Sequence, residues 1–358
     1  MDALLNEMRV LGDPETDRLM SNIFASGEAT LSVPEMLKHP WSGEYFAQHS
    51  RLPDWADPTK IEQGQELFYR YGMTIVTLLF FSALPEGYAC RKPAEVLVRT
   101  GNMVDGRSIL QRILRTAQFL IDVMMPANLT ENGAGVRSAV QLRLLHSAVR
   151  TRLGCEDWAA DRVLINQEEL AGTLGTFSVL MLEGMQDFEI DFTPDEIDAY
   201  LHVWNVVGYL MGIDERLLQA RFEDASLQFH TIKVRIQSPC QEGRALTKAL
   251  LDFLHEMIPG EALDGLADTL MRHTVGEKLA ADLSIPECDW TGCFIPILKR
   301  IGCWTDQAGD SSLTVRKGLE KMQTKLIEGL MGYYSAEAFQ VRVPDGLRSR
   351  WGLGAETA

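Results

Sequence analysis

The sequence predicts an all-α protein, and three features of the 358-residue chain support this fold class. Apolar residues recur at the three- and four-residue spacing of helices along most segments. Pairs that start helices, such as Asp13-Pro14, Asp57-Pro58 and Thr193-Pro194, precede several of these segments. No stretch alternates apolar and polar residues between hairpin turns, as sheet strands would. We therefore expect one compact helical domain.

Proline separates the beginning of the chain from its main part. Residues 1–56 contain four prolines, which divide this segment into short helices. We expect these short helices to wrap around the outside of the core. Residues 57–351 carry the longer periodic segments and form the predicted main domain, and residues 352–358 form a tail.

The main domain begins with a helix that we expect to stop at Pro85. Its second half, Met73 to Leu84, is apolar on all sides but too short to cross a membrane, so a buried helix is predicted. A short segment at residues 92–100 follows. Further helices are predicted at residues 107–124, 135–153, 166–185, 193–212, 221–236, 243–257, 262–283 and 314–334, followed by a partly extended end at residues 339–351.

The charge balance excludes one large class of partners. The chain has 50 acidic against 34 basic residues and a net charge of −16. Nucleic acids and anionic membrane surfaces both require basic patches, so neither is an expected partner. The N-terminal residues include acidic side chains and no apolar leader segment, from which we expect a cytoplasmic protein.

The cysteines do not form a recognisable framework. Six cysteines are spread along the chain without a CxxC motif, which predicts reduced thiols. Cys288, Cys293 and Cys303 would need a fourth ligand to hold a metal, and none is evident. Buried free thiols are the alternative.

Most catalytic motifs that a sequence can show are absent. We find no GxGxxG after a strand, no GxxxxGK[ST], no GxSxG, no HExxH and no paired ExxH. Asp198 and His202 stand at i and i+4 on a predicted helix, a spacing that can ligate a metal. Without a second pair on another helix, a solvated or core-edge pair is the alternative.

Two predicted helices between residues 107 and 153 carry the most distinctive polar residues. Arg112, Arg115 and Thr116 lie on one side of the first helix, at i, i+3 and i+4. On the second helix an imidazole lies among apolar residues, because His146 shares a stripe with Ala139, Leu142, Val149 and Leu153.

Arg143 and Arg150 lie one turn before and one turn after this histidine. A histidine in apolar surroundings with arginines nearby is suited to hold a haem and its carboxylates. The alternative is a hydrogen-bonded core histidine with arginines that form salt bridges to Asp and Glu.

These residues resemble a known family. The segment LRLLHSAVRTRL is similar to the histidine helix of the rubber oxygenase (latex clearing protein) family, which also includes oxygenases resembling the one that cleaves a farnesyl chain in the mycophenolic acid pathway. Arg112, Arg115 and Thr116 match the family's Arg-x-x-[Lys/Arg]-Thr pattern. INQEELAGTLGTFSVLMLEGM, HVWNVVGYLMGI and VPDGLRSRW are similar to further family segments, so the resemblance covers about Asp57 to Trp351.

The resemblance implies a globin-like helical core with additional surrounding helices and a non-covalent haem b. His146 would be the proximal axial ligand of the iron, and Arg112 and Thr116 would belong to the distal pocket and support haem binding. The implied reaction is cleavage of a carbon–carbon double bond by O₂, which yields two carbonyl ends. The implied substrate is an isoprenoid or another apolar olefin.

Two departures from the family bear on mechanism. Rubber-cleaving members have lysine where this chain has Arg115, and a guanidinium has no lone pair with which to ligate iron. We therefore expect an open distal position, toward which Arg115 donates hydrogen bonds. The family also uses a distal glutamate as a base, for which Glu95 is the nearest candidate. A helical protein that binds haem or a hydrophobic ligand without oxygenase activity is the alternative function.

Overall fold

The computed structural model describes residues 1–26, 36–100, 107–154, 163–188, 190–257 and 265–287. Within these ranges every regular element is a helix, and the β-type pairing is an isolated bridge between Cys90 and Gln237. The predicted all-α class is thereby confirmed. The predicted helix at residues 314–334 and the extended end at residues 339–351 lie outside the described residues.

The chain forms two compact units that do not follow its order. Unit 1 comprises Met1–Glu66, Asp122–Val179 and Pro194–Ile236, and unit 2 comprises Leu67–Ile121, Leu180–Thr193 and the chain from Gln237 onward. The predicted domain limits at residues 56 and 351 stay predictions.

Unit 1 is built from helices that come from three separate stretches of chain. They are α1 (Asp2–Met8), α2 (Pro14–Ala25), α4 (Pro40–His49), the start of α5 (Pro58–Leu78), α9 (Ala134–Leu153), α10 (Gln167–Phe177), α12 (Pro194–Leu210), the 3₁₀ helix η3 (Glu215–Leu217) and α13 (Phe222–Ile236).

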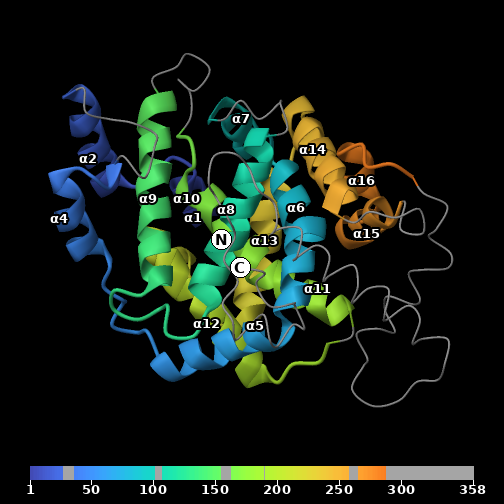
Figure 1. Ribbon diagram of the computed structural model, residues 1–358, viewed down its shortest axis with the longest axis horizontal. Coiled ribbons are helices and arrows are strands. Elements are labelled where there is room, and N and C mark those ends of the chain that lie inside the picture. The colour runs from blue at the N-terminus through green and yellow to red at the C-terminus, as the bar shows by residue number, and fades with distance from the viewer. Residues whose placement is uncertain (27–35, 101–106, 155–162, 189, 258–264, 288–358) are drawn as a thin grey trace, which may run out of the picture. The chain divides into compact units, whose positions relative to one another are not determined.

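Side-chain caps set the beginnings of these helices, as the sequence predicts. Asp13 accepts a hydrogen bond from the Thr16 backbone N–H, and Pro14 occupies the first helical position of α2. Asn166 and Glu169 form a reciprocal capping box at the start of α10. Helices α2 and α4 pack on α9, and α10 packs on α13 (Figure 1).

Unit 2 contains the remaining helices. They are the rest of α5, the π-helix η1 (Leu79–Ala83), α6 (Leu84–Tyr88), α7 (Arg91–Thr100), α8 (Arg107–Met124), most of α11 (Val179–Asp187), α14 (Gln241–Met257), α15 (Leu266–Val275) and α16 (Glu277–Asp282). In Figure 1, α14, α15 and α16 lie together, consistent with their mutual packing.

The predicted stop at Pro85 is wrong, because α5, η1 and α6 form one continuous helix from Pro58 to Tyr88. Pro85 lies in the first turn of α6, where its missing N–H is tolerated. The Phe81 carbonyl, which an α-helix would pair with the N–H of residue 85, accepts a hydrogen bond from Thr274 Oγ1. A local π-turn and a tertiary hydrogen bond thus carry the helix past the proline.

By length and composition alone, this 31-residue helix is able to cross a membrane. However, 67% of its apolar window is buried inside the protein, as in the core helix of a folded domain.

Two predicted helices are each divided in two. The predicted helix at residues 166–185 is interrupted at Ser178, whose N–H and Oγ both donate to the Leu174 carbonyl. The predicted helix at residues 262–283 is interrupted at Gly276, whose φ of +82° is left-handed. Neither break interrupts the apolar periodicity, so periodicity alone did not reveal them.

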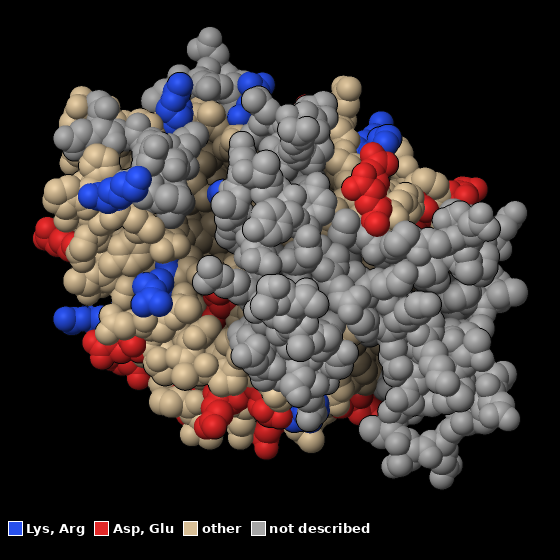
Figure 2. All heavy atoms as spheres, in the orientation of Figure 1, with Lys and Arg blue, Asp and Glu red and all other residues tan. Residues whose placement is uncertain are grey.

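The basic side chains drawn in Figure 2 form separate groups on that face rather than one continuous patch. Cys90 and Cys240 are free and buried, as predicted, whereas the cysteine triad at residues 288–303 lies outside the described part of the chain.

Candidate functional site

Helix α9 of unit 1 carries the histidine that the sequence singles out. His146 is half-buried in this helix. Arg143, Ser147 and Arg150 face helix α2 instead, where they contact two aspartates. The arginines that flank the histidine therefore form ion pairs with carboxylates of a neighbouring helix.

Arg143 forms a two-pronged ion pair with Asp13. Its Nε lies 2.6 Å from Asp13 Oδ2 and its second amino group 3.1 Å from Asp13 Oδ1. Little water reaches this pair, because the side chains are 14% and 5% exposed. Gly212, with a φ of +77°, makes room for it, since a Cβ there would lie 2.5 Å from Arg143 Nε.

The charges around this pair stabilise one another. Burial alone would raise the pKa of Asp13, but Arg143 and Thr16 outweigh burial and lower that pKa below its usual value. Burial and the Arg143 charge both lower the pKa of His49. A neutral His49 then accepts a hydrogen bond from Arg143 at 3.1 Å through Nδ1.

Arg150 makes the second connection between α9 and α2. Its Nε lies 2.9 Å from Asp17 Oδ1, and Ser147 Oγ donates to the same oxygen at 2.6 Å. The remaining Arg150 hydrogen bond goes to the Ile165 carbonyl just before α10. These contacts match the salt-bridge alternative, so Arg143 and Arg150 are not carried into the site proposed below.

Helix α8 of unit 2 carries the other group of predicted residues. Arg112 is half-buried, and burial lowers the pKa of its guanidinium below the usual value. Within the described residues no carboxylate opposes this shift, and the nearest ionisable group that does so is the Tyr88 phenol, which would have to lose its proton to carry a charge. Tyr88 is 2% exposed, and burial raises its pKa to about 12, so the phenol remains neutral at physiological pH.

Among the residues that the structure describes, Arg112 has no carboxylate partner. A desolvated guanidinium without an anion is costly, and its fork of donors is shaped for a carboxylate or phosphate. Arg112 is thus a candidate to bind an anionic group.

The other predicted residues of unit 2 lie in different environments. Thr116 is half-buried, and its hydroxyl donates to the Arg112 carbonyl at 3.0 Å. Arg115 is exposed on the same helix. Glu95 is half-buried on α7. The structure therefore brings Arg112 and Thr116 together in one helical turn, while His146 belongs to the other unit.

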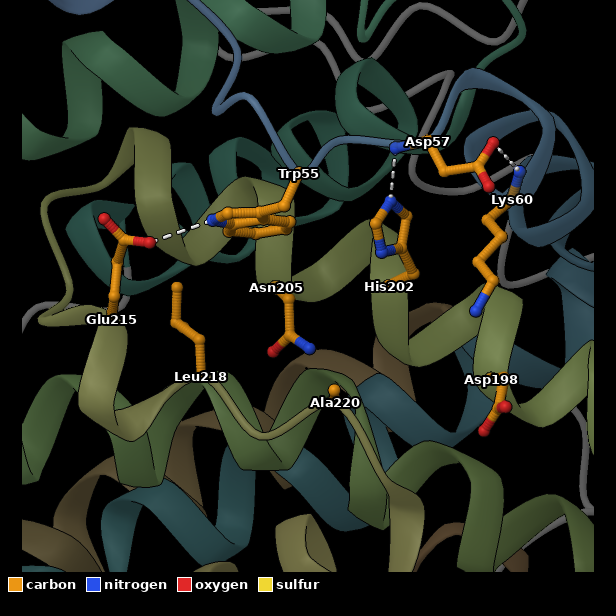
Figure 3. Close-up of a pocket in the computed structure, with 9 residues that line it drawn as sticks. All are labelled: Trp55, Asp57, Lys60, Asp198, His202, Asn205, Glu215, Leu218 and Ala220. Atoms are coloured by element: carbon orange, nitrogen blue, oxygen red, sulfur yellow. Dashed lines mark hydrogen bonds between the residues drawn. The ribbon is translucent and has the colours of Figure 1, made fainter.

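The Asp198–His202 pair lines a surface pocket of unit 1 (Figure 3). His202 Nε2 accepts a hydrogen bond from the Asp57 backbone N–H at 2.9 Å. In the described ranges no three His, Cys, Asp or Glu residues are placed to hold a metal ion.

Two residues to which the sequence assigns no role beside the histidine helix hold the arginines of α9. Asp13 pairs with Arg143 and Asp17 with Arg150. The aspartates are four residues apart and the arginines seven, so each pair lies on one helical face. That spacing is visible in the sequence, but nothing in the sequence shows that the two faces meet.

These observations define the class of protein: it is helical throughout its described part, with a histidine on one helix and, on another, an arginine without a carboxylate partner among the described residues. Residues 69–293 match the family described as "ER-bound oxygenase mpaB/B'/Rubber oxygenase, catalytic domain". This match spans more than half of the chain. The chain therefore belongs to the mpaB/rubber oxygenase family, which makes it an oxygenase.

Individual relatives agree with this family. The rubber oxygenase of Streptomyces sp. (strain K30) is 24% identical over 291 residues, which cover 75% of this chain and 69% of that protein. The structure of latex clearing protein LCP in the closed state matches with a TM-score of 0.76 and 19% identity, and covers 94% of both chains. At this identity the structural match shows the fold.

Proposed function

We propose that this protein is a haem-b-dependent oxygenase that cleaves a carbon–carbon double bond of an isoprenoid or another apolar olefin. In the proposed reaction the alkene and one O₂ give two carbonyl groups, and each carbonyl takes one oxygen atom. The relative from Streptomyces is named a rubber oxygenase, which supports an olefinic substrate. The shared family supports the same class of chemistry.

The observation that carries the haem proposal is the state of Arg112. A haem presents two propionates, which are the anions that a desolvated guanidinium lacks among the described residues. Haem b would supply the activation of O₂. His146 would hold the iron through its imidazole, and Arg112 would provide the positive charge that pairs with a propionate.

The other residues of the proposed site act on oxygen and on the substrate. Arg115 has a guanidinium without a lone pair for metal ligation, and it would donate hydrogen bonds toward O₂. Glu95 is the proposed base that removes a proton from the allylic carbon of the substrate. Both roles rest on the family resemblance of their helices, α7 and α8.

Absorption spectroscopy and isotope labelling test the proposal. The protein, produced with a haem supply, should show a Soret band with one haem per chain. Squalene, an apolar isoprenoid, should then consume O₂ and give carbonyl products that each carry one ¹⁸O from ¹⁸O₂. Squalane, its saturated analogue, should give neither. A preparation with full haem and no oxygen consumption across olefins would instead support the binding-protein alternative.

The variant His146→Ala tests the axial ligand. We expect the loss of stoichiometric haem with the helical circular dichroism spectrum retained. The matched control is His202→Ala, which removes an imidazole of unit 1 from a different helix and should keep full haem. Normal haem content in His146→Ala would refute the assignment.

A further inference from the structure

The pocket beside α12 is lined by groups whose hydrogen-bonding capacity is not used within the described residues. It has a volume of about 380 Å³ and lies entirely within unit 1. The lining side chains that matter here are Trp55, Lys60, Asp198, His202, Asn205 and Glu215 (Figure 3). Asp198, His202 and Asn205 come from one face of α12, at i, i+4 and i+7.

Asn205 presents a carbonyl oxygen to this pocket. The residue is only 7% exposed, and its amide nitrogen donates to the Gln219 carbonyl at 2.8 Å. Since a backbone carbonyl accepts only from the nitrogen, the orientation of the amide is fixed. Its Oδ1 has no hydrogen-bond partner among the described residues, and Figure 3 shows the amide beneath Trp55. Because Asn205 lines the pocket, this oxygen can accept a hydrogen bond from a donor on a ligand.

Trp55 forms the opposite wall. Its indole Nε1 donates to Glu215 at 2.9 Å, and its ring packs edge to face with His202 and Tyr209. The ring is therefore held in one orientation, yet 39% of the residue is exposed. A fixed and exposed indole is a platform for an apolar or cationic group, because its face carries negative electrostatic potential.

The charges of the pocket favour a cation. Asp198 makes no ion pair within the part of the chain that the structure describes, and Glu215 keeps one carboxylate oxygen beyond its bond to Trp55. Lys60 is the opposing positive charge of the lining. His202 adds none, because accepting from the Asp57 N–H requires an unprotonated Nε2, and a low pKa caused by burial keeps the ring neutral.

From this geometry we infer that the pocket binds a small organic ammonium ion, with its nitrogen between the Trp55 face and Asn205 Oδ1 and near the free carboxylate oxygens. An N–H donor on the ligand satisfies Asn205, and its alkyl part covers the indole. The net charge of −16 raises the local concentration of cations and favours the same class. This inference does not depend on the proposed oxygenase reaction.

Titration of the full-length protein with n-butylammonium tests the inference by NMR. 1-Butanol serves as the neutral analogue and butyrate as the anionic analogue. We expect saturable binding of n-butylammonium, with little or no binding of the other two. Binding of butyrate as tight as that of n-butylammonium would overturn the inference, because Lys60 and the His202 ring would then select the ligand. Absence of saturable n-butylammonium binding would overturn it as well.

Two variants and one matched control locate the site. Asp198→Asn should weaken binding by about tenfold, since it removes a negative charge from the pocket lining. Trp55→Leu should weaken binding by roughly three- to fivefold through loss of the aromatic face. Asp195→Asn removes an equal charge from the first turn of α12, outside the pocket lining, and should leave affinity unchanged. Equal affinities in Asp198→Asn and Asp195→Asn would show that only net charge matters and would refute the site.

Discussion

The ion pair between Arg143 and Asp13 allows a test that separates structure from cofactor binding. We expect Arg143→Met to destabilise the haem-free protein strongly. Methionine keeps most of the volume and the helix propensity of the arginine stem, so the main change is the loss of charge and hydrogen bonds. Asp13 is left 5% exposed without its partner, next to Thr16 and the start of α2.

The magnitude follows from burial. Removal of one member of a buried, hydrogen-bonded ion pair costs about 3–5 kcal/mol, because the remaining charge is uncompensated. The Arg150–Asp17 pair is wetter, since the Asp17 side chain is 28% exposed. We expect Arg150→Met to lower the free energy of unfolding by less, about 1–3 kcal/mol. A larger loss in Arg143→Met than in Arg150→Met tests the burial argument more strictly than either value alone.

Chemical denaturation of the haem-free protein, followed by circular dichroism, measures both variants. The double variant Arg143→Met/Asp13→Asn should recover a large part of the loss, because asparagine keeps the N-cap of α2 and removes the unpaired charge. A loss below about 1 kcal/mol in Arg143→Met would refute the reasoning. A double variant as unstable as the sum of its single changes would refute it too.

Three further predictions concern individual residues. Arg112→Met should leave the haem-free protein equally stable or more stable, because it removes a partly desolvated charge. The same variant should weaken haem binding by roughly 10- to 100-fold in a haem titration. Unchanged haem affinity would contradict the proposed propionate contact. The pKa of His49 lies below its unfolded value of 6.5, so its contribution to stability is complete above pH 6.5 and declines as the pH falls through the folded pKa. His49→Asn should therefore flatten the stability profile between pH 7.5 and 5, where wild type loses up to about 1.4 kcal/mol per pH unit through this group; parallel profiles would refute this role. The resting ferric protein should show no nitrogenous sixth ligand from the chain, and it should bind imidazole without first displacing one. Arg115→Lys should introduce such a ligand. An amine- or imidazole-type sixth ligand in the wild-type spectrum would overturn the open site.

The sequence predicted the helices well where one local rule decides the structure. Asp13-Pro14 and Asn166 begin helices as their capping chemistry requires. The predictions failed where a tertiary contact overrides a local rule. Pro85 does not end its helix, because Thr274, distant in the sequence, satisfies the Phe81 carbonyl that the proline leaves open. No local pattern contains that hydrogen bond.

The site could be predicted only in part, for a related reason. Residue type and spacing placed Arg112 and Arg143 in the same category, as arginines near a possible haem. The structure separates them by their partners, since Arg143 has Asp13 and Arg112 has no carboxylate among the described residues. A sequence shows which residues carry charge, but it does not show which charges meet.

The difference between these two arginines also indicates where binding energy is available. A buried charge that is already paired gains nothing from a new anion, since binding would first have to break the existing pair. A half-buried guanidinium without a carboxylate has already lost part of its water, so an arriving propionate gains a charge-assisted interaction at a smaller desolvation cost. The Arg112 charge would therefore lower the free energy of unfolding of the haem-free protein. Haem binding would raise it again, because the propionate compensates this charge. On this argument Arg112 would contribute to the affinity for the proposed haem, while Arg143 and Asp13 stabilise the packing of α2 on the helix that carries His146.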